Sequence, residues 1–186
     1  MNLSTNRLLA VIVLVCVVVI FTPIGVIRSV SALASDIEEG FYNGVYNDEE
    51  GYTEKSIQSH LDNRANAANG LLTLSSQLGI TDSAYNDLQS ARYALIDSVT
   101  ISDRFSANEL ITKYSEEVYD LISGMELTED QQQMLDYYMQ TLRGAQTAIE
   151  GLSYNDTVSE FYDKTLKTFP VSLFSPFLKT GPEYFS

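Results

Sequence analysis

The sequence predicts an all-α protein, in which an N-terminal transmembrane helix precedes an antiparallel bundle of about four helices with one long C-terminal helix. Three observations lead to this prediction. Residues 8–27 form an apolar run in which only Thr22, Pro23 and Gly25 are not strongly apolar. Proline is absent between Pro23 and Pro170, and apolar residues in the rest of the chain recur at intervals of three and four. The expected domains are a short N-terminus with the anchor (1–34), a linker (35–52) and a helical bundle domain (53–186).

The apolar run, LLAVIVLVCVVVIFTPIGVI, contains no charged residue. At about 1.5 Å per residue it forms a helix of about 30 Å, which matches the hydrocarbon core of a bilayer. We therefore expect residues 8–27 to contact a lipid bilayer. Cys16 lies inside the run and is expected to be a small apolar helix residue.

A cleaved signal peptide is the alternative interpretation of the same segment. Arg7 supplies the basic N-terminal region of a signal peptide, and Ala32-Leu33-Ala34 has the small-x-small form of a cleavage site. Two features favour an uncleaved anchor. The apolar run is longer than the usual ~7–15 residues of a signal peptide, and Arg28 separates it from the candidate site after Ala34.

The basic residues beside the apolar run predict its orientation. The N-terminal side carries Arg7 and the α-amino group, whereas the other side carries only Arg28 before the acidic residues begin at Asp36. Cations favour the cytoplasmic side, and acids contribute little to this rule. We therefore expect a single-pass protein of a bacterial cell membrane, with the C-terminal domain outside the cytoplasm.

Charge and composition exclude several classes of function. The chain has 11 Lys and Arg against 25 Asp and Glu, a net charge of −14, and every acidic residue lies at or beyond Asp36. Nucleic-acid binding is excluded because phosphate contact requires a surplus of cations. A protein partner with a basic surface is favoured instead, and weakly bound cations are the other favourable contact for such a surface. One Cys and one His argue against a disulfide framework and a transition-metal centre.

Apolar spacing predicts the first two helices of the body. The first covers about 53–78 and ends at Gly79, a residue that favours the position just after a helix. The second begins after the cap Thr81-Asp82. Their expected buried stripes are Ile57, Leu61, Ala65, Ala68, Leu72 and Leu78 for the first, and Tyr85, Leu88, Leu95, Ile96 and Val99 for the second.

The third helix is expected to begin at Ser106, with Glu109 at the spacing of a capping box. The fourth is expected to begin after Thr128 and to run from 129 to 167, because Gly151 alone costs only about 1 kcal/mol in a helix. Phe169-Pro170 ends it, and the tail folds back with a short helical turn to cover one end of the bundle. The expected stripes are Leu110, Tyr114, Val118, Leu121 and Met125, then Leu135, Tyr138, Leu142, Ala145, Ile149 and Leu152.

No group of residues indicates catalysis. The single His60 has no identifiable partner, and the acidic runs at 48–50 and Glu116-Glu117 lack the spacing of a calcium loop. Tyrosines at helical spacing are expected to pack in the core, and the glycosylation sequon at Asn155 is interpreted as chance. We therefore predict no enzyme activity, with no catalytic, cofactor-binding or metal-binding residues and no cofactor.

Two segments carry a pattern that is more specific than composition. The first is Ile57-Gln58-Ser59-His60-Leu61-Asp62-Asn63-Arg64-Ala65-Asn66 with Leu71-Leu72, and the second is Tyr154-Asn155-Asp156-Thr157-Val158, Phe161-Tyr162, Thr168-Phe169-Pro170 and Gly181-Pro182-Glu183-Tyr184-Phe185. Together they resemble the LemA family of bacterial membrane-anchored helical proteins, as a divergent member in which Arg64 alone remains of a paired arginine. The resemblance implies an antiparallel helical bundle, no established enzymatic activity and no catalytic residue.

Two hypotheses of function follow. The first is a membrane-anchored, non-enzymatic helical protein of the bacterial envelope that acts as an interaction or scaffold module. The second is a helical bundle that senses a small molecule through a partner membrane protein. A pocket between helices that is lined by Tyr and contains a buried charge would favour the second hypothesis, and a solid core would count against it.

Overall fold

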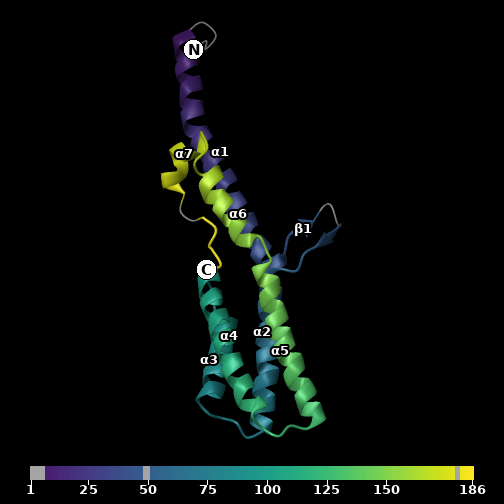
Figure 1. Cartoon of the computed structure of the whole chain (residues 1–186). Helices are drawn as coiled ribbons and strands as arrows, with labels where there is room; N and C mark the ends of the chain where they lie inside the picture. The colour runs from purple at the N-terminus through teal and green to yellow at the C-terminus, as the bar shows by residue number, and fades with distance from the viewer. Residues whose placement is uncertain (1–6, 48–50, 179–180) are drawn as a thin grey trace. The chain divides into compact units, whose positions relative to one another are not determined.

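The computed structural model describes residues 7–47, 51–178 and 181–186 and is all-α, with one small hairpin (Figure 1). The chain divides into two compact units. The anchor unit comprises Met1–Glu38 and Asp156–Pro182, and the bundle unit comprises Glu39–Asn155 and Glu183–Ser186. Each unit therefore contains two segments that are distant in the sequence.

Four helices form the bundle unit: α2 (Ile57–Gln77), α3 (Ser83–Asp97), α4 (Ile101–Ser123) and α5 (Glu129–Glu150). Successive helices run antiparallel because short connections join them, as Figure 1 shows. A side-chain cap begins each helix, since the residue before it accepts a hydrogen bond from a backbone N–H of the first turn. The caps are Ser56, Asp82, Thr100 and Thr128, and Thr128 forms a full capping box with Gln131.

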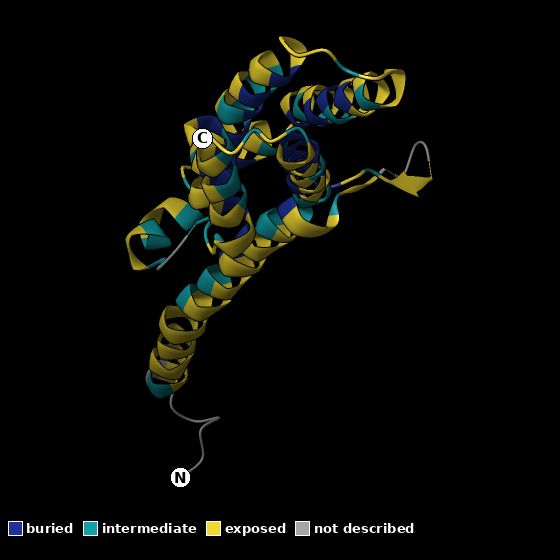
Figure 2. Ribbon diagram, turned by 90° about the horizontal axis from the view of Figure 1, so that it is seen from below, coloured by how far each residue is buried: buried dark blue, intermediate teal, exposed yellow. Residues whose placement is uncertain are grey.

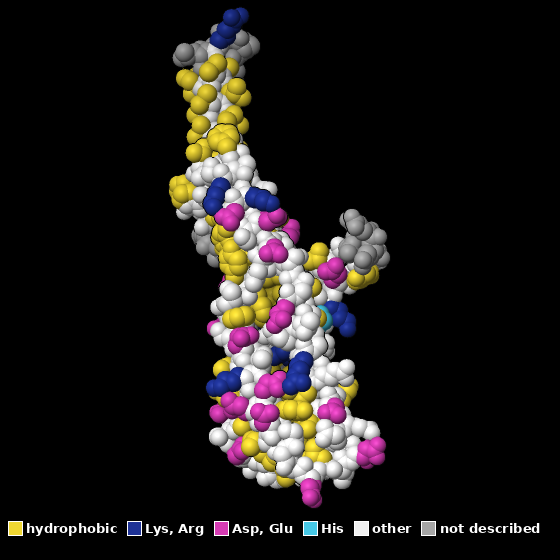
Figure 3. All heavy atoms as spheres, in the orientation of Figure 1, with side chains coloured by type: hydrophobic (Ala, Val, Ile, Leu, Met, Phe, Trp, Pro, Cys, Tyr) yellow, Lys and Arg dark blue, Asp and Glu magenta, His cyan; other side chains and the backbone are white. Residues whose placement is uncertain are grey.

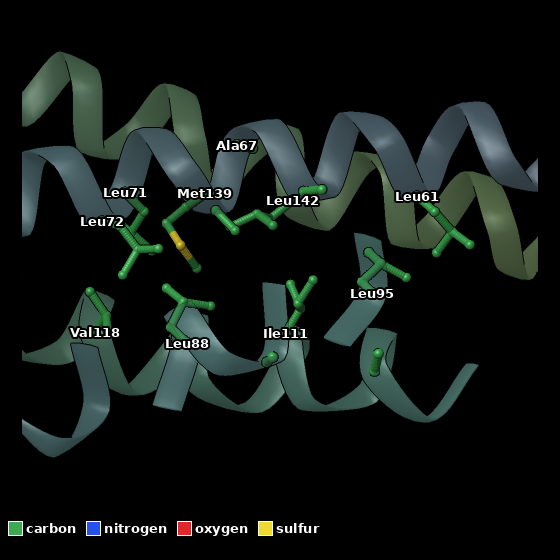
Figure 4. Close-up of a cluster of buried hydrophobic side chains, with 14 of the residues drawn as sticks. Leu61, Ala67, Leu71, Leu72, Leu88, Leu95, Ile111, Val118, Met139 and Leu142 are labelled. Carbon is green, nitrogen blue, oxygen red and sulfur yellow. The ribbon is translucent and has the colours of Figure 1, made fainter. Parts of the chain in front are cut away.

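Apolar side chains from all four helices meet inside the bundle unit. Figure 4 shows Leu61 and Leu71 of α2, Leu88 of α3, Ile111 of α4 and Leu142 of α5 directed toward one another, and each is at most 2% exposed. In Figure 2 the buried residues lie on the inward faces of these helices. The predicted antiparallel bundle is confirmed.

The first predicted helix begins later than expected and ends as expected. The cap at Ser56 starts α2 at Ile57, while Thr53 belongs to a strand. At the other end Gly79 has φ +79°. The N–H of Ile80 bonds to the carbonyl of Ser75 at 3.0 Å, which closes the helix in the manner of a Schellman motif.

The predicted start of the third helix is wrong, and its predicted buried stripe is confirmed only at Tyr114 and Val118. Thr100 caps α4, so Ser106 lies inside the helix and donates its hydroxyl to the carbonyl of Ser102. Leu110, Leu121 and Met125 are exposed, as are Ile96 and Val99 of the second predicted stripe. The face of α4 that is buried holds Asn108, Ile111, Ser115, Val118 and Ile122. Two polar residues on this face concealed the stripe from a search for apolar spacing.

Residues 129–167, expected to form one helix, are divided into three segments. The segment α5 ends at Glu150, α6 covers Tyr154–Glu160, and a π-helical turn, η2, covers Phe161–Thr165. Gly151 closes α5 through its N–H, which bonds to the carbonyl of Thr147 at 3.1 Å. The break allows Leu152 to pack against the bundle core.

Residues 35–52, expected to be a linker, contain regular structure. Helix α1 (Arg7–Asn43) extends well past the apolar run, and β1 (Tyr46–Asn47) pairs with β2 (Tyr52–Thr53). Gly44, at φ +81°, makes the turn out of α1, and a Cβ there would lie 2.0 Å from the carbonyl oxygen of Glu54.

The last residues of the chain, 183–186, close one end of the bundle unit, as the sequence predicted for the tail, whereas the short helical turn of the tail belongs to the anchor unit. The side-chain amide of Asn155 donates to the carbonyl of Phe185 and accepts from its N–H, both at 2.9 Å. The Phe185 ring packs against Phe41 and Phe105 at centroid distances of 5.6 and 5.2 Å. Glu183 accepts the first N–H of α4, from Ile101, at 2.9 Å. The tail thereby caps α4 and extends the core.

The anchor unit combines an exposed apolar helix with a small core. Side chains from Val11 to Ile24 on α1 are exposed or half-buried, and they form the yellow coat of its N-terminal part in Figure 3. This one helix among the described residues is long and apolar enough to cross a membrane. Further along α1, Val30 and Ala34 are buried in a cluster with Phe161. The short helix α7 (Val171–Phe174) and the 3-10 turn η3 (Ser175–Phe177) follow the π-helical turn.

Candidate functional site

Arg64 is the largest fully buried side chain of the bundle unit, with 1% of its surface exposed. Its Nη1 donates to the carbonyl of Leu142 on α5 at 2.9 Å. Its Nη2 donates to the hydroxyl of Thr112 at 2.6 Å and to the carbonyl of Asn108 at 3.4 Å, both on α4. Arg64 on α2 therefore joins three helices through neutral oxygen atoms.

A cleft between α4 and α5 has Arg64 at its wall. Helix α4 packs mainly on α3 and helix α5 mainly on α2, so α4 and α5 contact each other little. The cleft has a volume of about 170 Å³. We call it the Arg64 cleft, and its lining consists of Arg64, Thr112, Ser115, Glu116, Leu142, Arg143, Gln146, Thr147 and Glu150.

Two buried polar atoms at this place lack a hydrogen-bond partner among the described residues: Nε of Arg64 and Oδ1 of Asn108. Asn108 is fully buried, and its Nδ2 donates to Oε1 of Gln146 at 2.9 Å. Leaving a buried donor or acceptor unpaired costs about 1–3 kcal/mol. Two of the four such atoms among the described residues therefore belong to Arg64 and to its neighbour Asn108.

The charge of Arg64 is not neutralised by direct contact. Among the described residues no carboxylate lies within ion-pair distance of it. Burial lowers the pKa of Arg64 to about 10, and the nearby charges of Glu109 and Glu150 partly oppose this effect. The guanidinium therefore stays protonated at neutral pH. The cleft contains a persistent buried positive charge.

The other charged groups of the cleft lie nearer to solvent. Arg143 forms a bidentate pair with Glu116, with nitrogen–oxygen distances of 3.0 and 2.8 Å. The pair raises the pKa of Arg143, first through the hydrogen bond and then through the charge of Glu116. Gln146 donates to Glu150 at 2.8 Å. Both carboxylates thus have partners of their own.

Of the residues that the sequence offered as candidates for catalysis or metal binding, only Glu116 lines this cleft. His60 is half-buried, and burial together with Lys55 lowers its pKa. Glu117 lies 4.0 Å from Lys113. The acidic run 48–50 lies outside the described residues, within which no group of His, Cys, Asp and Glu is arranged to hold a metal ion. Four tyrosines were expected to pack in the core: Tyr85, Tyr114 and Tyr138 pack against the core of the bundle unit, and Tyr162 packs against the small core of the anchor unit.

The sequence contains a signal for the Arg64 cleft. Arg64 lies three residues after Leu61 and four before Ala68, so it belongs to the predicted buried stripe of the first helix. A charged residue on such a stripe is rare unless it is paired or functional. Asn108 and Gln146 carried no comparable signal, because both are common on solvent-facing helix surfaces.

No family model, curated protein or solved structure matches this chain.

Proposed function

We propose that the chain is a single-pass membrane protein that keeps its N-terminal anchor. The packing of the anchor unit supports this proposal. Val30 and Ala34 are buried with Phe161, which is itself only 2% exposed. Cleavage after Ala34 would remove two members of this small core. Exposing one large apolar side chain costs about 1.5–3 kcal/mol.

The mass of the mature chain tests the retention of the anchor. The uncleaved chain is expected in the membrane fraction after alkaline carbonate washing, at a mass that includes residues 1–34. A mature chain that begins at Ser35 and leaves the membrane would refute the proposal. Protease added to intact cells then reports whether the bundle unit lies outside the cytoplasm, as the basic residues flanking the run suggest.

Two substitutions on α1 test whether the small core holds the anchor unit together. Val30→Asp places a charge at a position that is 5% exposed, whereas Leu33→Asp places the same charge at a position that is 41% exposed. We expect the first variant to make residues 156–182 more sensitive to limited proteolysis and the second to leave them unchanged. Equal sensitivity in both variants would contradict the role of this core.

We further propose that the tethered bundle is a non-enzymatic interaction module of the bacterial envelope and a divergent member of the LemA family. Two parts of the C-terminal pattern lie together in the structure, which supports the family proposal: Tyr154 and Asn155 donate hydrogen bonds to the backbone carbonyls of Glu183 and Phe185. The acidic residues at and beyond Asp36 favour a basic protein partner. Crosslinking of the full chain in membranes should then capture a partner whose yield falls with added salt. Capture at neither low nor moderate salt would remove this support.

A second candidate function is small-molecule sensing through a partner membrane protein. The observation that favours it is the Arg64 cleft, which combines an opening between two helices with a buried charge. The tyrosines expected in the lining of such a pocket are not among the residues that line this cleft. Ligand binding between α4 and α5 would change how these two weakly contacting helices pack. A signal would reach the membrane partner through the bundle in this case.

A further inference from the structure

We infer that residues 168–178, which we call the interfacial segment, insert the apolar side chains of Phe169, Leu173 and Phe177 into the surface of the lipid bilayer beside the anchor. This inference rests on the proposed retention of the anchor and adds a second membrane contact to it. It depends on three properties of the anchor unit: the composition of the segment, its level along α1 and the exposure of its side chains.

The interfacial segment contains no charged residue, although the chain as a whole is rich in acids. Its sequence is TFPVSLFSPFL, and Lys167 and Lys179 flank it. The anchor unit carries five basic and five acidic residues, so the net charge of −14 belongs entirely to the bundle unit. Anionic lipid therefore does not repel the anchor unit, and basic residues at the ends of an apolar segment suit the lipid headgroups.

The interfacial segment packs on the part of α1 where the apolar run ends. Val171 and Leu178 pack against the small core that Val30 and Ala34 form with Phe161. In Figure 1 the helix of this segment, α7, lies beside α1. The segment and the end of the anchor are therefore at one level along the axis of α1.

This level is that of the lipid headgroups. Val26 of the apolar run also packs against the small core, and Arg28 is the first charged residue after the run ends at Ile27. Val30 follows Ile27 by three residues, which is about 5 Å along a helix. The headgroup layer extends about 5–8 Å beyond the hydrocarbon core on each side of the bilayer. The small core, and with it the interfacial segment, lies within this layer.

Three large apolar side chains of the segment lack cover from the described residues. Phe169 is 77% exposed, Leu173 61% and Phe177 69%, whereas Val171 and Leu178 are half-buried on the small core. An element beside a spanning helix at the headgroup level has lipid as its lateral neighbour. Amphipathic elements at this level bury their apolar side chains about 5–10 Å into the boundary of headgroups and acyl chains. Lipid thus covers the three side chains and extends the apolar contact of α1.

Tryptophan fluorescence in brominated lipid tests the insertion, because the natural chain contains no tryptophan. Phe177→Trp is reconstituted as the full chain, at one copy per nanodisc, in phosphatidylcholine with or without bromine on the acyl chains. Its emission should be shifted to shorter wavelength and should fall by about half in the brominated lipid, since the expected depth brings the ring to the acyl chains. Leu173→Trp repeats the measurement if Phe177→Trp disturbs the fold.

Two further single-tryptophan variants calibrate the measurement. Val18→Trp lies in the apolar run at a position that is 53% exposed, so strong quenching there reports that the anchor is in the bilayer. Tyr137→Trp lies on α5 of the bundle unit at a position that is 64% exposed, close to the exposure of Phe177. It is the matched control and should emit at long wavelength with little quenching.

Equal quenching of Phe177→Trp and Tyr137→Trp, in nanodiscs that quench Val18→Trp, would overturn the inference and leave the anchor in place. Emission of Phe177→Trp at short wavelength without quenching would overturn it as well, because a second copy or another protein surface would then cover the ring instead of lipid. Absence of quenching in Val18→Trp would refute the membrane anchor and the inference with it. A failure of this inference and a failure of the proposed membrane function can therefore be told apart.

Discussion

Replacing Arg64 by methionine should leave the bundle as stable as before or make it more stable. Methionine keeps the apolar stem and most of the volume of the side chain, and it removes the buried charge. The carbonyls of Asn108 and Leu142 that accept from Arg64 belong to regular helices, so they keep their helical hydrogen bonds. Replacement of a buried charge by an apolar residue of similar size is often neutral or stabilising by about 1–4 kcal/mol.

The pKa of Arg64 gives the magnitude. Its decrease from the usual value to about 10 corresponds to about 3 kcal/mol against the charged form in the folded state. The folded chain binds fewer protons than the unfolded chain only above about pH 10, so the whole penalty is present at neutral pH and disappears at higher pH. Loss of three hydrogen bonds offsets part of it. The expected gain for Arg64→Met is therefore about 0–3 kcal/mol.

Urea unfolding of the full chain in detergent, followed by far-UV circular dichroism, measures this free energy. Arg64→Ala is expected to lose about 2–4 kcal/mol, because truncation leaves a cavity as well as removing the charge. Arg143→Met removes an exposed pair and should change stability by less than about 1 kcal/mol. If Arg64→Met were destabilised by more than about 2 kcal/mol, the argument would fail, and Arg64 would be a structural centre of the bundle.

Three other predictions concern packing, the tail and pH. Gly70→Ala should lower the free energy of unfolding by about 1–3 kcal/mol, because its Cβ would lie 2.2 Å from the Tyr138 ring. Gly144→Ala has open space around its Cβ and should raise the free energy of unfolding by up to about 1 kcal/mol. Thermal unfolding compares the two variants. Asn155→Ala should speed amide exchange at Phe185, since both hydrogen bonds to that residue are lost, and an unchanged exchange rate would contradict the clamp. Because the pKa of His60 is lowered in the folded chain, the unfolded chain binds more protons than the folded chain at pH values just below the usual pKa of histidine. Stability should therefore decrease as the pH falls through that window and do so less in His60→Gln, as urea midpoints at several pH values would report.

The sequence predicts the helices of the bundle well wherever a cap and an apolar stripe agree. Asp82 and Thr128 cap their helices as expected, and Gly79 ends the first. The prediction fails where the signals conflict. Asn108 and Ser115 occupy buried positions of α4 through hydrogen bonds to neighbouring groups, so hydropathy assigned the exposed Leu110, Leu121 and Met125 to the buried stripe in their place.

The candidate site is less predictable because it depends on partners far apart in the chain. Arg64 donates to residues 44 to 78 positions away, a relation that no local pattern contains. The break after Glu150 has a similar origin. Tyr154 and Asn155 start a new segment that is held by the C-terminal residues 183 and 185, so the tolerance of a helix for Gly151 did not decide the outcome.

The division of the anchor unit between two distant segments has a consequence for biosynthesis. Phe161 follows Ala34 by 127 residues. At a synthesis rate of about 5–20 residues per second, Phe161 is made about 6–25 s after Ala34, and the buried face of α1 lacks this contact until then. The bundle unit is complete earlier except for its last residues, and its entry and exit lie side by side, with the Phe41 and Tyr154 rings 5.4 Å apart. Folding of α2 to α5 thus shortens the loop that the anchor unit must close. Residues 183–186, which complete the bundle unit, are made only after both segments of the anchor unit.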